Sequence, residues 1–149
     1  MTDLVKLAER LHRRIRWQEI PETMTSADLI DILIDAIRML YVISGRTFQF
    51  SDDMIVRTED PETGITDVEF SETLELDEQE WVLLEAEISF YNMALSNVDD
   101  LQSYTTDAMS VTHGDKPYKN IKATVEDRQM KQAVVWTRMV RFNQLGVTG

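Results

Sequence analysis

The chain has 149 residues, of which 43% are hydrophobic and 28% charged, with no cysteine and a formal net charge of -12. This length predicts one domain with its own core, and the lack of cysteine excludes disulfides and thiolate zinc sites. No run approaches the roughly 18 apolar residues of a membrane span, and the N-terminus lacks the apolar stretch of a signal peptide. We therefore expect a soluble protein that is made inside the cell.

The charge is unevenly distributed. Residues 1–19 carry a net charge of +2, residues 20–110 carry -18 and residues 111–149 carry +4. An acidic surface that aids solubility explains this pattern. Self-association, in which the basic ends of one subunit meet the acidic middle of the next, explains it equally well. Binding of nucleic acid over the whole surface is disfavoured by the sign of the charge.

The first expected helix, of roughly four turns, has an apolar stripe at helical spacing formed by Leu4, Leu7, Leu11 and Ile15. Basic side chains lie on its other faces: Lys6, Arg10, Arg13, Arg14 and Arg16. Such a helix binds a membrane or phosphate surface, or docks on the core of its own protein. We expect docking, with Trp17 at the end of the helix and Pro21 in a short connection.

The second expected helix runs from residue 25 or 26 to about residue 44, since Thr25 or Ser26 can cap it and Gly45 can end it. Its inward-facing residues are Leu29, Ile30, Leu33, Ile37, Leu40 and Tyr41. Asp31 and Asp35 lie one turn apart on the outer face. Without a third ligand or a nearby histidine, they indicate a solvated face and not a metal or acid–base pair.

Residues 47–75 change in character, with short runs of Thr, Val, Ile and Phe interrupted by DPETG at residues 60–64. This pattern predicts a β-hairpin in which residues 54–58 pair with residues 65–70. Acidic side chains are concentrated around its tip: Asp52, Asp53, Glu59, Asp60, Glu62 and Asp67. Their spacing does not match a calcium-binding EF-hand. We interpret them as a solvated loop or as a contact for a basic partner.

The third expected helix, residues 76–98, organises the rest of the chain. Its apolar residues recur at spacings of three and four: Trp81, Leu84, Ile88, Tyr91, Leu95 and Val98. Further apolar residues leave only a narrow polar strip, so we expect this helix to be covered on most sides. Asp77 is expected to cap it, with Glu80 in the capping-box position. The polar run at residues 97–100 predicts a kink or break before residues 101–110.

The region around residues 111–120 is rich in turn formers, with Gly114 and Pro117 as the strongest helix breakers. A last helix is expected at residues 120–142, followed by a flexible tail at residues 143–149 that orders on contact. Its Trp136 and Phe142 alternate with Arg138 and Arg141. These residue types either anchor a protein interface or stack on nucleic-acid bases, and we favour the interface.

No internal repeat, phosphate-binding loop, nucleophile elbow or metal motif occurs in the sequence. The two histidines, His12 and His113, lie far apart and have no ligand spacing around them. The sequence therefore predicts a protein that is not an enzyme and binds no cofactor or metal. From the residues alone, the fold class is mainly α: one domain over residues 1–149, a bundle of four to five helices with an acidic hairpin insertion at residues 47–75.

Three stretches of this chain, SADLIDILIDAIRMLYVISG, WVLLEAEISFYNMAL and SYTTDAMSVTHGDKPYKNIKATVEDR, carry a family resemblance. In their order of helices and breakers they resemble the small adaptor (head-completion) proteins of tailed bacteriophages. The resemblance implies a mostly helical subunit in a ring of about twelve copies below the portal. It also implies a homo-oligomer in the neck of the virion, made in the host cytoplasm. Its partners would be the portal and tail or neck proteins, with no membrane and with DNA passing through without sequence-specific binding.

If the resemblance holds, the central helix is shared with the neighbouring subunit, the acidic body lines a channel, and the basic last helix and tail reach the portal or another adaptor. The residues expected at partner or subunit interfaces are Trp136, Arg138, Arg141, Phe142, Arg13, Arg14, Trp17, Asp60 and Glu62. Two alternatives remain open. One is another neck or tail completion protein, and the other is a small acidic inhibitor that mimics DNA and blocks a nucleic-acid enzyme.

Overall fold

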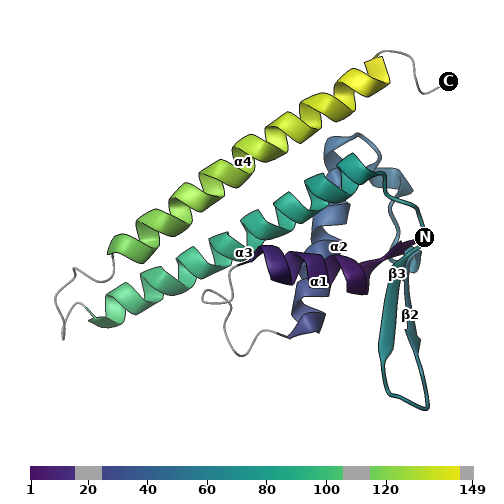
Figure 1. The fold of residues 1–149 in the computed structure, drawn as a ribbon, viewed down its shortest axis with the longest axis horizontal. Coiled ribbons are helices and arrows are strands. Elements are labelled where there is room, and N and C mark those ends of the chain that lie inside the picture. The colour runs from purple at the N-terminus through teal and green to yellow at the C-terminus, as the bar shows by residue number, and fades with distance from the viewer. Residues whose placement is uncertain (16–24, 106–114, 145–149) are drawn as a thin grey trace.

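The structure is a computed structural model that describes residues 1–15, 25–105 and 115–144, with side chains for residues 1–15, 25–93 and 121–140. This part of the chain forms four α-helices and a small antiparallel sheet (Figure 1). The predicted fold class, a mainly helical bundle with a small β-hairpin, is confirmed. Within the described ranges, no helix is long and apolar enough to cross a bilayer.

Helix α1 (Leu4–Arg14) follows directly after the short strand β1 (Thr2–Asp3). The Asp3 carboxylate caps α1 by accepting hydrogen bonds from two backbone N–H groups of the first turn, at 3.0 and 3.2 Å. The predicted apolar stripe is at most 3% exposed, and α1 contacts α2, α3 and β3. The stripe therefore docks on the protein's own core, on a helix of 11 residues that is shorter than predicted. Trp17 and Pro21 lie outside the described residues.

Helix α2 (Ser26–Ile43) begins and ends where the sequence predicts. Thr25 and Asp28 form a capping box, in which the Asp28 carboxylate accepts the Thr25 N–H at 2.9 Å and the Thr25 hydroxyl accepts the Asp28 N–H at 3.4 Å. At the other end, Gly45 adopts φ +72°, a conformation that other residues avoid. All six residues that were predicted to face inward are buried.

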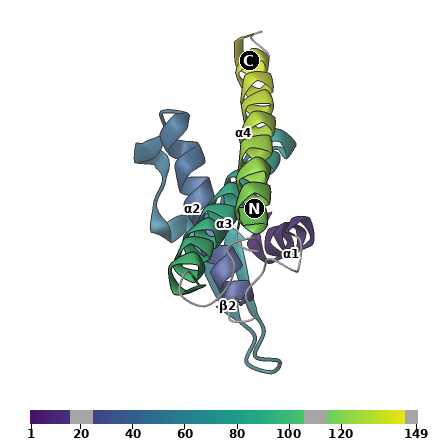
Figure 2. The same ribbon diagram turned by 90° about the vertical axis from the view of Figure 1, so that its left-hand side faces the viewer.

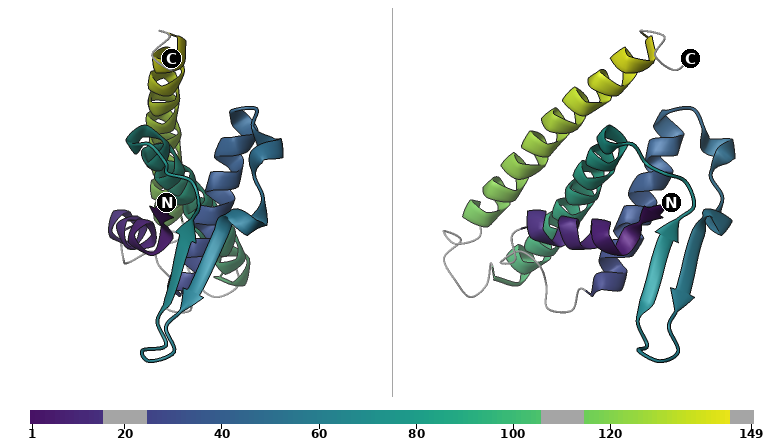
Figure 3. Two further views of the ribbon diagram at one scale, coloured as in Figure 1. Left: turned by 90° about the vertical axis from the view of Figure 1, so that its right-hand side faces the viewer. Right: turned by 45° about the vertical axis from the view of Figure 1, so that its right-hand side comes forward.

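The predicted hairpin consists of β2 (Ile55–Glu59) and β3 (Thr66–Phe70). Its tip projects away from the helices (Figures 1 and 3). Strand β1 pairs with the other edge of β3, giving the order β1-β3-β2. The sequence did not predict β1, because a strand of two residues is too short to show alternation.

Two short 3-10 helices, η2 (Thr47–Gln49) and η3 (Asp52–Met54), connect α2 to the hairpin. The aromatic ring of Phe70 lies 6.0 Å from Tyr41 on α2 and 6.3 Å from Phe50, measured between ring centroids. These contacts hold the base of the hairpin on α2.

Helix α3 (Leu76–Thr105) is continuous through residues 97–100, so the predicted break is wrong. Asparagine, valine and aspartate have ordinary helix propensities, and without Gly or Pro they do not interrupt a helix. The predicted cap is also wrong, because the helix begins at Leu76 and places Asp77 inside the first turn. Glu78, not Glu80, accepts the backbone N–H of Glu75 at 3.0 Å.

Helix α4 (Asp115–Gln144) begins five residues before the predicted start. Pro117 lies in its first turn, where a backbone N–H has no partner within the helix and a proline is tolerated. The helix also includes the first two residues of the predicted tail, and residues 145–149 lie outside the described part of the chain. His113 and Gly114 lie outside it as well.

The core surrounds the first half of α3, as the sequence predicts. Helix α3 contacts α1, α2 and α4, and Figures 1 and 2 show α4 along one side of it with α1 and α2 on others. The residues that α3 buries are Trp81, Val82, Leu83, Leu84, Ala86, Glu87, Ile88, Phe90 and Tyr91. One of them, Glu87, is charged.

Candidate interaction surfaces

The interior of the helical bundle contains a carboxylate, Glu87 on α3, that is only 1% exposed. A guanidinium nitrogen of Arg14, from α1, lies 3.2 Å from Glu87 Oε2, and Nε of Arg128, from α4, donates to Oε1 at 3.3 Å. Arg14 also donates two hydrogen bonds, of 3.0 and 2.8 Å, to Glu80. We call these four residues the Glu87 cluster. Because a buried charge needs paired partners, the cluster joins α1, α3 and α4.

The environment of Arg128 keeps its guanidinium charged. Burial lowers the pKa of Arg128, but the carboxylates of Glu87 and Asp127 more than compensate and raise it above its usual value. Asp127 in turn accepts a hydrogen bond from Lys131, and this bond, with the charges of Lys131 and Arg128, lowers the pKa of the Asp127 carboxyl. Both residues therefore remain ionised at neutral pH.

Polar pairs fix the register between α3 and α4. Arg138 donates to Asp77 at 2.9 Å, and Gln132 donates to Glu85 at 2.6 Å. The residue numbers of the paired side chains decrease along α4 as they increase along α3, so the two helices are antiparallel. Arg138, a predicted interface residue, thus has an intramolecular partner and is still 58% exposed.

The outer face of α4 carries apolar side chains that the fold leaves in solvent. Met130 is 72% exposed and Val134 is 63% exposed, although both are on the helix that packs on α3 through Ile121, Val125 and Val135. Ala133, Val134 and Thr137 line a surface depression of about 370 Å³. We define the α4 stripe as Met130, Ala133, Val134 and Thr137.

A second exposed apolar surface lies at the C-terminal end of α2. Met39, Val42 and Ile43, at helical spacing, are 43%, 46% and 41% exposed. We call these three residues the α2 patch. Phe48 follows shortly after in η2 and is 84% exposed. The sequence did not indicate this surface, because Met39, Val42 and Ile43 were assigned neither to the inward-facing nor to the outward-facing residues of the helix.

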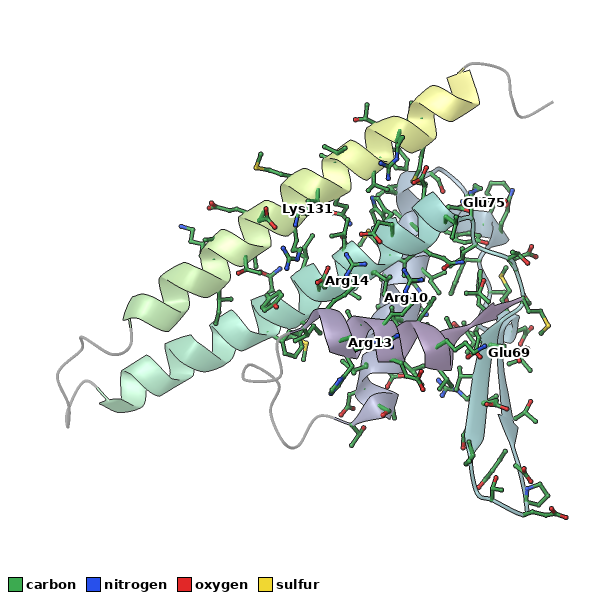
Figure 4. The ribbon with its side chains drawn as sticks, viewed as in Figure 1. Arg10, Arg13, Arg14, Glu69, Glu75 and Lys131 are labelled. Atoms are coloured by element: carbon green, nitrogen blue, oxygen red, sulfur yellow. The ribbon has the colours of Figure 1, made fainter. Side chains whose placement is uncertain are left out.

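The structure does not bring the nine predicted interface residues together. Trp136 is half-buried against the core, beside exposed Arg138 on α4. Arg14 is part of the Glu87 cluster, while Arg13 is exposed and makes no ion pair with a described residue. Figure 4 shows both arginines on α1, with Arg14 beside α3. Trp17 and the side chains of Arg141 and Phe142 lie outside the described part of the structure.

The remaining two predicted residues, Asp60 and Glu62, are at the hairpin tip. The Asp60 side chain accepts the backbone N–H of Glu62 at 2.9 Å, and its carbonyl accepts the N–H of Gly64 at 2.8 Å. The hydrogen bond from the Glu62 N–H has the largest effect on the Asp60 carboxyl and lowers its pKa. A weaker effect in the same direction comes from a hydrogen bond with Thr63. Asp60 therefore shapes the turn, and Glu62 is an exposed charge.

The paired aspartates of α2 lie along an open groove of about 410 Å³ between α2 and the hairpin. Arg57 lies 3.7 Å from Asp31, and Arg38 lies 3.5 Å from Asp35 and 3.2 Å from Asp52. Among the residues that the structure describes, no three His, Cys, Asp or Glu side chains form a group able to hold a metal ion. The carboxylates here are exposed members of ion pairs.

The buried charge that the sequence did not indicate is Glu87. A signal was present, since Glu87 lies seven residues after Glu80 and so on the same side of a helix whose other residues there are apolar. Neither arginine partner was predictable, because the contacts depend on how α1 and α4 pack on α3.

Comparison of the chain with protein-family models, curated proteins and solved structures finds no match. The resemblance to phage adaptors therefore remains a prediction.

Proposed function

We propose that the protein is a structural component of a tailed-phage virion, a connector that forms a ring in the neck between the portal and the tail. In this role it performs no catalysis and needs no cofactor. The observation that carries the proposal is the α4 stripe, where Met130 and Val134 remain exposed on a chain that already has a complete core. Apolar side chains on the outer face of a long helix suit contact with another protein subunit.

The distribution of charge supports the same role. Acidic side chains are exposed along α2, η3 and the hairpin, and a negative surface repels the phosphates of DNA. A channel lined in this way lets DNA slide past without sequence-specific binding. The portal and the tail or neck proteins are then the partners, and assembly follows synthesis in the host cytoplasm.

The proposal is tested by the molar mass of the purified chain in light scattering, alone and after mixing with the portal protein of a candidate phage. Negative-stain imaging of the large species then shows its shape. We expect a closed ring in at least one of the two samples. A monomer of 17.3 kDa at every concentration in both samples would contradict the connector function.

The acidic hairpin supports a second candidate, a DNA-mimicking inhibitor of a nucleic-acid enzyme. Glu59, Asp60, Glu62 and Asp67 are all exposed on one projecting element. An inhibitor of this kind binds a basic enzyme as a monomer, and the affinity falls steeply as salt is raised. Titration of such an enzyme at two salt concentrations separates this candidate from the connector, since only the inhibitor predicts loss of enzyme activity.

A further inference from the structure

The fold converts the charge pattern of the sequence into two differently charged sides. Described side chains on α1 and α4 include eight Lys or Arg and three Asp or Glu, whereas residues 26–70 include three Lys or Arg and ten Asp or Glu. The left view of Figure 3 shows α2 and the segment that joins it to the hairpin on one side, away from α1 and α4, while the hairpin extends below α1. We call α1 with α4 the basic side and residues 26–70 the acidic side.

Internal ion pairs do not remove this difference. Arg14, Arg128 and Arg138 pair with carboxylates of α3, but Lys6, Arg13 and Lys122 on the basic side are exposed and make no ion pair with a described residue. On the acidic side, the exposed carboxylates that make no ion pair with a described residue include Asp53, Glu59, Glu62 and Asp67. The two sides thus retain opposite net charge.

Each side also has an exposed apolar surface. The α4 stripe is on the basic side, and the α2 patch is on the acidic side. Contact of a basic side with another basic side brings like charges together, and so does contact between two acidic sides. Contact between the α4 stripe and the α2 patch instead joins helices of opposite net charge, because the described side chains of α4 include four Lys or Arg and two Asp or Glu, whereas α2 has one arginine and three aspartates.

We propose that copies of this chain associate head to tail, with the α4 stripe of one copy on the α2 patch of the next. This inference rests on the proposed ring-forming function and specifies which surfaces meet. A head-to-tail contact uses two different surfaces of each copy. An open row of copies therefore has a free α4 stripe at one end and a free α2 patch at the other. Such a contact closes into a ring when its rotation permits.

Two variants, each altered on one surface, test the pairing. Met130→Glu with Val134→Glu places carboxylates on the α4 stripe, and Met39→Glu with Val42→Glu places them on the α2 patch. All four side chains are more than 40% exposed, so we expect both variants to fold, with the helical circular dichroism of the wild type. Met93→Glu on α3, at a methionine that is 49% exposed and on neither surface, is the matched control.

The measurement is sedimentation velocity of concentrated protein at low salt. We expect the wild type and Met93→Glu to form oligomers and each double variant to be a monomer, with assembly weakened at least about tenfold. An equimolar mixture of the two variants should then give a dimer of twice 17.3 kDa. One intact stripe meets one intact patch in this mixture, while the two altered surfaces repel each other.

A mixture that stays monomeric would overturn the head-to-tail pairing, because a contact between identical surfaces is not restored by mixing. Variants that assemble like the wild type would overturn it too, yet would leave the ring-forming function intact. A wild type that is monomeric in this experiment would also overturn the pairing. The connector function would then be tested by light scattering of the mixture with the portal protein.

Discussion

At the scale of single residues, Glu87 decides how the helices are held together. Its carboxylate is almost fully buried, and Arg14 and Arg128 reach it from two different helices. Both arginines keep part of their side chains in water, at 27% and 23% exposure. Removal of the Glu87 charge therefore leaves two arginines without this partner, but both remain partly in contact with water.

We expect Glu87→Gln to lower the free energy of unfolding by about 2 kcal/mol, less than the loss for a fully buried pair, because water reaches both arginines. Urea denaturation followed by circular dichroism measures this difference. Glu80→Gln is the matched control, because Glu80 binds the same Arg14 but is 36% exposed, and we expect it to cost less than about 1 kcal/mol. Equal losses in the two variants would contradict the central role of Glu87.

Asp60 makes the hairpin turn depend on pH. The pKa of its carboxyl is lowered from a usual value of 3.8 because the ionised form accepts hydrogen bonds from Glu62 and Thr63. A lowered pKa means that Asp60 stabilises the turn above its usual pKa, and that this contribution disappears as the pH falls through the lower, folded-state value. We expect NMR signals of Gly64 and Ile65 to shift below about pH 4, and Asp60→Asn to abolish that shift. A shift that survives in Asp60→Asn would assign it to another group.

At the scale of elements, the sequence correctly predicted the helix and the hairpin whose ends are marked by capping or turn residues. The capping box at Thr25 and the positive φ of Gly45 delimit α2, and the Pro-Gly turn at residues 60–64 delimits the hairpin. Elements without local marks were predicted less well. The polar run in α3 was mistaken for a break, and the early start of α4 was missed because Pro117 was assumed to end a helix and not to begin one.

The interaction surfaces were predicted only in part, for a physical reason. Exposure of Met130 and Val134 depends on which face of α4 packs on α3, and that face carries buried residues such as Val125 and Val135, whose neighbours on α3 are distant in the sequence. The basic character of α4 was visible in the sequence. The intramolecular ion pairs that Arg128 and Arg138 make with α3 were not visible in it.

The end of α2 offers a direct test of element-scale reasoning. Gly45 has φ +72°, and a Cβ added there meets no atom within 4 Å, so only backbone strain opposes a side chain. We expect Gly45→Ala to lower the free energy of unfolding by about 1 kcal/mol. Gly45→Asn should cost less, because asparagine tolerates this conformation better. Thermal denaturation of the two variants measures the order, and an equal or larger loss for Gly45→Asn would contradict it.

At the scale of the whole molecule, the arrangement of charge and apolar surface favours assembly. Opposite charge on two sides, each with exposed apolar residues, is a property of the folded chain that neither its total charge nor any single helix has. Because exposed charges are screened by salt, we expect self-association to weaken between about 0.05 and 0.5 M NaCl. An assembly that is unchanged over this range would show that the charged sides do not drive the contact.

The copy number of the assembled species tests the ring most directly. Native mass spectrometry of the wild-type assembly, formed alone or on the portal, measures it as a multiple of the 17.3 kDa chain. A closed head-to-tail ring predicts one discrete copy number well above two. A ladder of lengths would indicate open filaments, and a monomer alone and with the portal would contradict the connector function itself.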